Sequence, residues 1–351
     1  MRIETTIGTV LQLLDRPAFS ISDDMVCEVN RSAANRMIQP GMPFSQLYSA
    51  DPGVCRNFVS GQMMLTLNIN GSPANATGFL LEQTPIFVLD PPEDPHLQAF
   101  ALAAQELRLP LSQVMAVSEP LFSSLSDDPH TAGQLARVNR SLHQILRIVG
   151  NMSDAGATRA SRMELRDATA VFREIFDRME PLCEQAGMRV TFHNHPVPVY
   201  TLLDVQKMER AVYNLLSNAA RHAPSGGEIL IKFSRRDNSL SLSVENTGCE
   251  GTPQPIAELF GRYRREPGMD SVSTGLGLGL TLVRSAATAH QGILLLDHTK
   301  EGNLSATIRF PVRQKSFGLS SPMMRIDYAG ERDHGLVELS EILPPESYLP
   351  K

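Results

Sequence analysis

Residues 213–224 read YNLLSNAARHAP, and this stretch decides the fold of the C-terminal half of the chain. Apolar residues recur at three- and four-residue spacing here and just upstream, which predicts a helix over 205–222. Its buried stripe is expected to consist of Val205, Met208, Val212, Leu215 and Ala219. Asn214 and Asn218 are four residues apart and so share one helix face. Paired amides facing a pocket suit Mg²⁺, which takes oxygen ligands and is usually shared with substrate phosphates.

Two glycine-containing segments follow this helix in the chain. In VENTGCEG an apolar strand precedes Asn246, so its side chain should lie at the strand end, where it can contact a base edge. Gly248 would allow a close approach of the backbone. In STGLGLGL the residues Gly275 and Gly277 lead into an apolar-periodic helix. Backbone N–H groups at such a helix N-terminus attract phosphate.

Helix and strand patterns alternate from Met163 onward, which predicts a two-layer α/β domain. The helical patterns are VFREIFDRMEPLCEQAG and the segment 205–222, and the strand-like runs are RVTFH, VYTLL, EILIKF, LSLSVEN, ILLLD and SATIRF.

In this order and spacing, the segments resemble the ATP-binding domain of sensor histidine kinases, the Bergerat fold of the GHKL superfamily. The resemblance covers about residues 95–312 and implies that the chain binds ATP with Mg²⁺. It implies that Asn218 holds Mg²⁺ and that Asn214 lies near the phosphates. The other implied nucleotide-site residues are Arg221 and His222, in place of the usual Lys and Tyr, Asn246 in place of the adenine-reading Asp, Gly248, Phe260 and Arg262 of a lid (LFGRYR), and Gly275 and Gly277. Because an Asn carbonyl can still accept from the adenine amine, we expect binding to be retained.

Two long helical patterns precede this domain. The first runs from Leu97 to Leu121 and the second to about Met152, and an Asp-Pro pair precedes each, at Asp94-Pro95 and Asp128-Pro129. A helical hairpin with two apolar stripes cannot bury both alone, so we expect a homodimer with a four-helix bundle. The alternative is an intramolecular core against the flanking domains. Pro110 should kink the first helix.

The segment AAQELRLPLS lies inside the first helix, and Gln105 and Leu109 are expected on its outer face. It resembles the phosphoacceptor box of the same family, His-Glu-Leu-Arg-Thr-Pro-Leu. Glu106 is the retained acid, but Gln105 replaces the His and Leu109 replaces the Thr. The amide nitrogen of Gln105 is not nucleophilic, so autophosphorylation there is not expected. Leu109 cannot orient a water, which removes the usual dephosphorylation route as well.

The N-terminal 92 residues combine a short helical pattern with strand-like runs at 25–29, 63–69, 78–81 and 86–89. This order resembles a PAS sensor domain, although a generic α+β domain would give the same pattern. The region contains no His, so a histidine-ligated haem is not expected.

Composition limits the remaining classes. A formal net charge of -6 gives no basic surface for nucleic acid. The four cysteines are far apart, which indicates reduced thiols and no zinc site. No apolar run approaches the length of a membrane span, so we expect a cytoplasmic protein.

The sequence therefore predicts a multidomain α+β protein. The expected parts are a PAS-like sensor (1–92), a dimerisation hairpin (93–157), an ATP-binding domain (158–313) and a tail (314–351) whose Leu336, Leu339 and Leu343 form either a packed cap or a docking peptide. The expected function is a pseudokinase or regulatory scaffold in two-component signalling, with a response regulator or partner histidine kinase. The alternatives are an active kinase that phosphorylates a partner or non-standard His, and a GHKL ATPase outside signalling.

Overall fold

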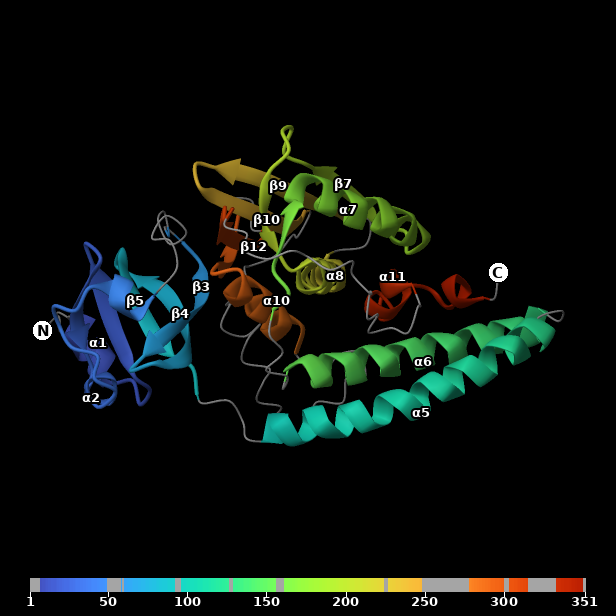
Figure 1. Cartoon of the computed structure of the whole chain (residues 1–351), viewed down its shortest axis with the longest axis horizontal. Coiled ribbons are helices and arrows are strands. Elements are labelled where there is room, and N and C mark those ends of the chain that lie inside the picture. Colours follow the sequence, from blue (N-terminus) through green and yellow to red (C-terminus); the bar gives the residue numbers. More distant parts are fainter. Residues whose placement is uncertain are drawn as a thin grey trace, which may run out of the picture.

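The computed structural model describes residues 7–48, 58, 60–91, 96–125, 129–155, 161–223, 227–247, 278–299, 303–314 and 333–349. Figure 1 shows three parts: N-terminal strands, a long helical hairpin along one side, and an α/β layer above the hairpin. Within the described ranges, no helix combines the length and apolarity needed to cross a bilayer.

Ten strands form one sheet, in the order β2-β1-β5-β4-β3-β11-β12-β10-β9-β7. Their bounds are β1 Ala18–Ser22, β2 Met25–Val29, β3 Gln62–Ile69, β4 Ser72–Leu81, β5 Thr84–Leu89, β7 Arg189–His193, β9 Glu228–Arg236, β10 Ser239–Asn246, β11 Ile293–His298 and β12 Leu304–Pro311. Among the strand pairs of this sheet that the described residues form, β7–β9 is parallel and the others are antiparallel. The N-terminal strands and the α/β layer therefore share one sheet, joined where β3 pairs with β11. A second sheet pairs β6 (Glu164–Asp167) with β8 (Tyr200–Leu203).

The N-terminal part has the predicted α+β character, with α1 (Ile7–Gln12), α2 (Arg31–Ala34) and α3 (Phe44–Leu47) beside its strands. All four predicted strands are present, and β1 is an additional strand. Asn30 holds the region together from a buried position: its amide donates to the carbonyl of Arg16 at 2.7 Å, and its oxygen accepts from the backbone N–H of Ala18 at 3.0 Å. The likeness to a PAS domain stays a prediction.

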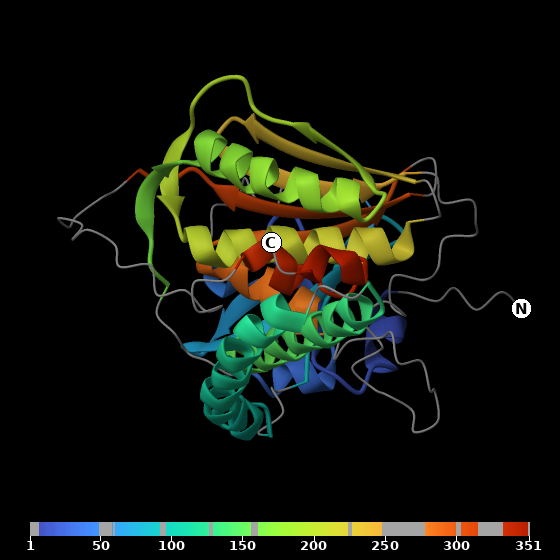
Figure 2. The ribbon, with the colours of Figure 1, turned by 90° about the vertical axis from the view of Figure 1, so that its right-hand side faces the viewer.

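The α/β layer contains α7 (Ala168–Gln185), α8 (Val205–His222) and α10 (Leu278–Ala289). Asp167 caps α7 and Asp204 caps α8, each accepting a backbone N–H of the first turn. Figure 2 shows α7 and α8 running lengthwise beside the strands. Four of the five residues of the predicted α8 stripe are buried in the main core, with Met208, Val212 and Leu215 at 0–3% exposure, and Val205 is partly buried against it. Every helix and strand predicted from Met163 onward is present; β6 was not predicted.

The hairpin consists of α5 (His96–Leu125) and α6 (Pro129–Ala155). Helix α5 continues through both Pro110 and Pro120. The buried positions of α5 in the single chain are Ala101, Ala104, Met115 and Phe122. Much of the apolar stripe of α5 is exposed in the single chain, because α5 packs mainly against α6. The exposed members are Phe100, Leu107, Val114 and Leu121.

The C-terminal segment packs between the hairpin and α8, with α11 (His334–Glu338) and a 3₁₀ turn η1 (Pro345–Tyr348). Leu339 and Leu343 are fully buried in the main core, and Leu336 packs against it. Val337 packs with Met115 and Leu146 of the hairpin. Of the two alternatives for the tail, residues 333–349 therefore form a packed cap.

Candidate functional site

The face of α8 that carries the paired amides is the centre of the site. Asn214 is 1% exposed, and its amide nitrogen donates to the carbonyl of Arg210 at 2.8 Å. Its Oδ1 is buried without a hydrogen-bond partner among the described residues. A Cβ at Gly279, in the first turn of α10, would lie 2.9 Å from this oxygen, so the close approach favours glycine. A buried carbonyl oxygen without a donor is costly, and a cation or a ligand donor would satisfy it.

Asn218 lies one turn further along the same face and is partly buried. Arg221 follows at the C-terminal end of α8 and forms an ion pair with Glu341 of the C-terminal segment. The face thus carries two amides followed by a guanidinium, a combination that suits a cation beside an oxyanion.

Asn246 lies at the end of β10, as predicted, and is 1% exposed. Its Oδ1 accepts the backbone N–H of Leu304 at 2.9 Å. Because a backbone N–H can only donate, this contact fixes which end of the amide faces β12.

Several predicted site residues lie outside the described residues. These are Gly248, Phe260, Arg262, Gly275 and Gly277, together with the side chain of His222.

The segment that resembles a phosphoacceptor box lies on α5, whereas the paired amides lie on α8. Gln105 and Glu106 are exposed, and Leu109 is 67% exposed, as the helix period predicted. A lone exposed Leu is ordinary, but this one occupies the position of a hydroxyl in the family pattern.

His143 lies near the middle of α6 and is buried. Its Nδ1 lies 2.8 Å from the carbonyl oxygen of Asn139. Its ring packs against that of Tyr348, with centroids 4.9 Å apart. The C-terminal segment therefore covers this imidazole.

Sequence reasoning missed an ionic cluster between α6, α8 and α11. Glu338 is fully buried; its Oε1 lies 3.2 Å from Nε of Arg210, and its Oε2 lies 3.6 Å from Nε of Arg147. Arg210 also pairs with Asp154 and donates to the side chain of Asn151 at 2.8 Å. The available signal was the pair Glu338 and Glu341, two acids three residues apart within an otherwise mostly apolar segment, LVELSEIL.

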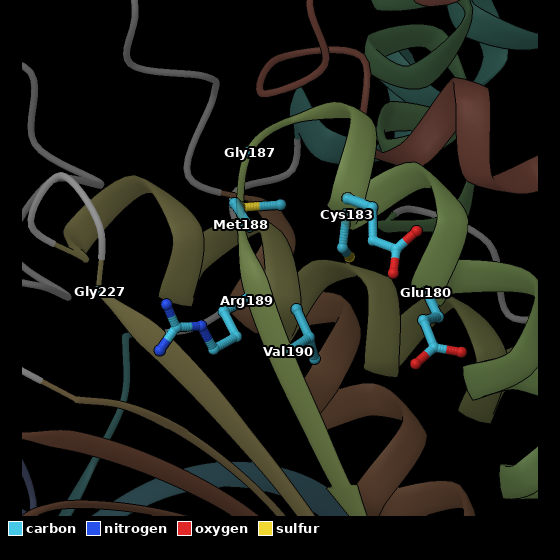
Figure 3. A pocket seen from close by; sticks show the side chains of 8 residues that line it. Glu180, Cys183, Gly187, Met188, Arg189, Val190 and Gly227 are labelled. Carbon is cyan, nitrogen blue, oxygen red and sulfur yellow. The ribbon is translucent and has the colours of Figure 1, made fainter.

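A separate pocket of about 290 Å³ lies between the end of α7 and the start of β7 (Figure 3). It is lined by Glu180, Cys183, Glu184, Gly187, Met188, Arg189, Val190 and Gly227, and includes none of the predicted site residues. Burial, with smaller contributions from Glu180 and Glu184, raises the pKa of the Cys183 thiol to about 12. Such a thiol is protonated at neutral pH and is a poor nucleophile.

Comparison with known proteins matches residues 203–314 to the family described as histidine kinase-, DNA gyrase B-, and HSP90-like ATPase. The hybrid signal transduction histidine kinase D of Dictyostelium discoideum is 29% identical over 226 residues, covering 61% of this chain and 15% of that protein. The histidine protein kinase DivJ of Caulobacter vibrioides is 26% identical over 217 residues, covering 60% of this chain and 36% of that protein. The crystal structure of full-length ShkA in complex with AMPPNP matches with 18% identity and a TM-score of 0.47, covering 63% of this chain and 47% of that one.

Residues 203–314, which contain the amide face of α8 and Asn246, are therefore an ATPase domain of this family. Over about three fifths of its length the chain is similar to histidine kinases. It spans well under two thirds of the length of the two kinases named above.

Proposed function

We propose that the protein binds Mg-ATP but does not phosphorylate itself at the usual site, and acts as a pseudokinase or regulatory scaffold in two-component signalling. The observation that carries this proposal is the identity of residue 105. Gln105 is exposed on α5 where the family has its acceptor imidazole, and an amide nitrogen has no basic lone pair to attack a phosphoryl group.

Three features support nucleotide binding. The family match covers the site, Asn218 lies one turn from Asn214 on one helix face, and the buried Oδ1 of Asn214 has no donor within the described ranges. We assign Mg²⁺ to Asn218, the phosphates to Asn214, Arg221 and His222, and the base to Asn246. Gly248, Phe260, Arg262, Gly275 and Gly277 complete the proposed site, with Glu106 as a retained acid on the hairpin.

Homodimerisation through the hairpin is part of the same proposal. Phe100, Leu107, Val114 and Leu121 are spaced seven residues apart on α5, and each is more than half exposed in the single chain. On α6, Val138 and Ile145 repeat the same spacing with 50% and 46% exposure. A heptad of exposed apolar residues on two adjacent helices is typical of a seam that a second copy buries. We further propose that the protein is cytoplasmic and that its binding partner is a response regulator or a partner histidine kinase. We also propose that the chain divides into four parts, with boundaries after residues 92, 157 and 313.

An active kinase that uses another histidine is the alternative. The covered position of His143 disfavours that residue as an acceptor. An ATPase outside signalling is disfavoured because the matches to histidine kinases cover about three fifths of this chain, well beyond residues 203–314.

The test is Mg-ATP binding by titration calorimetry on the full chain. Wild type should bind, Asn218→Ala should bind at least about tenfold more weakly because a metal ligand is lost, and Asn218→Asp should retain binding because a carboxylate also coordinates Mg²⁺. Asn35→Ala removes an exposed amide from the N-terminal part and serves as the matched control. Absence of binding by wild type at millimolar Mg-ATP would refute the nucleotide site.

A further inference from the structure

Residues 333–349, here called the C-terminal latch, lie beyond the ATPase family match, which ends at residue 314. The latch is an ordered part of the molecule. Asp333 caps α11 by accepting the N–H of Gly335 at 2.8 Å, and the hydroxyl of Tyr348 donates to the carbonyl of Leu336 at 2.8 Å. Its apolar residues enter two cores at once, because Leu339 and Leu343 pack in the ATPase core and Val337 packs in the hairpin.

Helix α6 binds the backbone of the latch through side-chain donors. Arg140 donates through Nε to the carbonyl of Ser340 at 3.0 Å and through Nη2 to that of Glu341 at 2.9 Å. Gln144 donates to the Ser340 carbonyl at 3.0 Å, and Asn139 donates to the Tyr348 carbonyl at 2.8 Å. These contacts fix the position of the latch along the hairpin.

The acidic side chains of the latch form ion pairs with arginines of helix α8. Glu338 pairs with Arg210, and Glu341 pairs with Arg221. Both acids also form ion pairs with Arg147 of α6, and Oε2 of Glu341 lies 3.0 Å from Nη1 of Arg147. The two carboxylates therefore bridge the hairpin and the ATPase domain.

The two arginines of α8 lie on the face that carries the amides. At 100° per residue, positions 210, 214, 218 and 221 fall within about 80° of the helix circumference. Glu338 and Glu341 are thus placed at the two ends of the proposed nucleotide-binding face. At the Arg221 end, the carboxylate of Glu341 pairs with the guanidinium. A phosphate could bind the same group, since both oxyanions accept hydrogen bonds from the fork of N–H donors.

We propose that the C-terminal latch is an autoinhibitory element: Glu341 competes with the nucleotide phosphates for Arg221. The inference rests on the proposed nucleotide binding and names its regulation. Phosphate at Arg221 displaces Glu341, which releases one of the bridges between α8 and α6. By thermodynamic reciprocity, the docked latch weakens nucleotide binding by the same factor by which bound nucleotide weakens docking of the latch.

The test is the affinity of the full chain for Mg-ATP in four proteins, measured by calorimetry. Glu341→Gln keeps the shape of a side chain that is 22% exposed, removes its charge, and should tighten binding by about two- to fivefold, the range of a partly exposed ion pair. Arg140→Gln removes the guanidinium that donates to the latch carbonyls of Ser340 and Glu341, and should tighten binding by about twofold because it loosens the latch. Glu346→Gln is the matched control: it removes an exposed acid of the same segment and should leave the affinity of wild type unchanged.

The outcomes separate the latch from the nucleotide site. Binding by Glu341→Gln that is tighter than wild type, or detectable only in Glu341→Gln, supports the latch. Equal binding by wild type and Glu341→Gln overturns the latch and leaves the nucleotide site in place. No binding by any of the four proteins overturns both. Hydrogen exchange gives a second readout: amides 333–349 of wild type should exchange faster when Mg-ATP is added, and unchanged or slower exchange contradicts competition.

Discussion

Met64 of β3 lies opposite Leu294 of β11 in an antiparallel pair, so the N-terminal strands continue the sheet of the ATPase domain. Side chains reinforce this junction: the hydroxyls of Thr66 and Thr288 lie 3.0 Å apart, and Arg284 of α10 pairs with Asp90. The N-terminal part is thereby attached to the ATPase domain through backbone hydrogen bonds as well as along the chain.

A first prediction compares two glycines of similar backbone conformation, one of which lies at this junction. Gly61 has φ +75° and Gly71 has φ +80°, so Ala at either position costs about 1–2 kcal/mol. A Cβ at Gly61 would also lie 2.1 Å from the carbonyl oxygen of Leu296, whereas nothing lies within 4 Å of one at Gly71. Gly61→Ala should therefore lower the free energy of unfolding by about 3 kcal/mol in urea titrations, well beyond Gly71→Ala. It should also speed hydrogen exchange in β11, and equal losses in the two variants would argue that the β3–β11 pairing is not a feature of the protein in solution.

A second prediction concerns the exposed apolar residues of the hairpin. Val117 of α5 is 67% exposed, and a charge there should dissociate a dimer that buries this helix. Light scattering at micromolar concentration should show twice the chain mass for wild type and the single chain mass for Val117→Glu. Val197→Glu, at a 59% exposed position between β7 and β8, is the matched control and should stay dimeric. A monomeric wild type would contradict the dimer.

The cysteines give a third prediction. Cys27 is exposed and Cys183 is buried, and burial raises the pKa of the Cys183 thiol to about 12. At pH 8, which is well below that pKa, Cys183 is protonated, so iodoacetamide should label Cys27 while sparing Cys183 in the folded chain. Denaturant should make Cys183 reactive. Peptide mass spectrometry reads both sites, and rapid labelling of Cys183 in the folded protein would mean that the α7–β7 region opens readily.

The elements of the ATPase domain could be predicted from the sequence because local patterns specify them. The 3.6-residue period places Met208, Val212 and Leu215 on one face of α8, and apolar runs mark β9 and β10. The same period correctly put Gln105 and Leu109 on the outside of α5. The strand-end position of Asn246 followed from the apolar run before it.

The long-range contacts could not be predicted in this way. The pairing of Met64 with Leu294 joins residues far apart in the chain, and the sequence of a strand carries no local mark of which distant strand will pair with it. The bond between Asn246 and Leu304 is hidden for the same reason. Glu341 and Arg221 are each ordinary surface residue types, and only the path of residues 333–349 along α6 brings them together. The helical period marks an apolar face of α5 without saying whether the same chain or a second copy covers it, so burial of this face in a dimer stays a prediction.

The central claim, a nucleotide-binding protein without its own phosphoacceptor, is tested most directly by incubating wild type and Gln105→His with γ-labelled Mg-ATP. The measurement is acid-labile, base-stable label on each protein, and the account predicts none on wild type and label on Gln105→His, because an imidazole at this exposed position supplies the missing nucleophile beside Glu106. Gln105→Asn is the matched control and should remain unlabelled. Label on wild type would contradict the claim and would show that another histidine accepts the phosphoryl group.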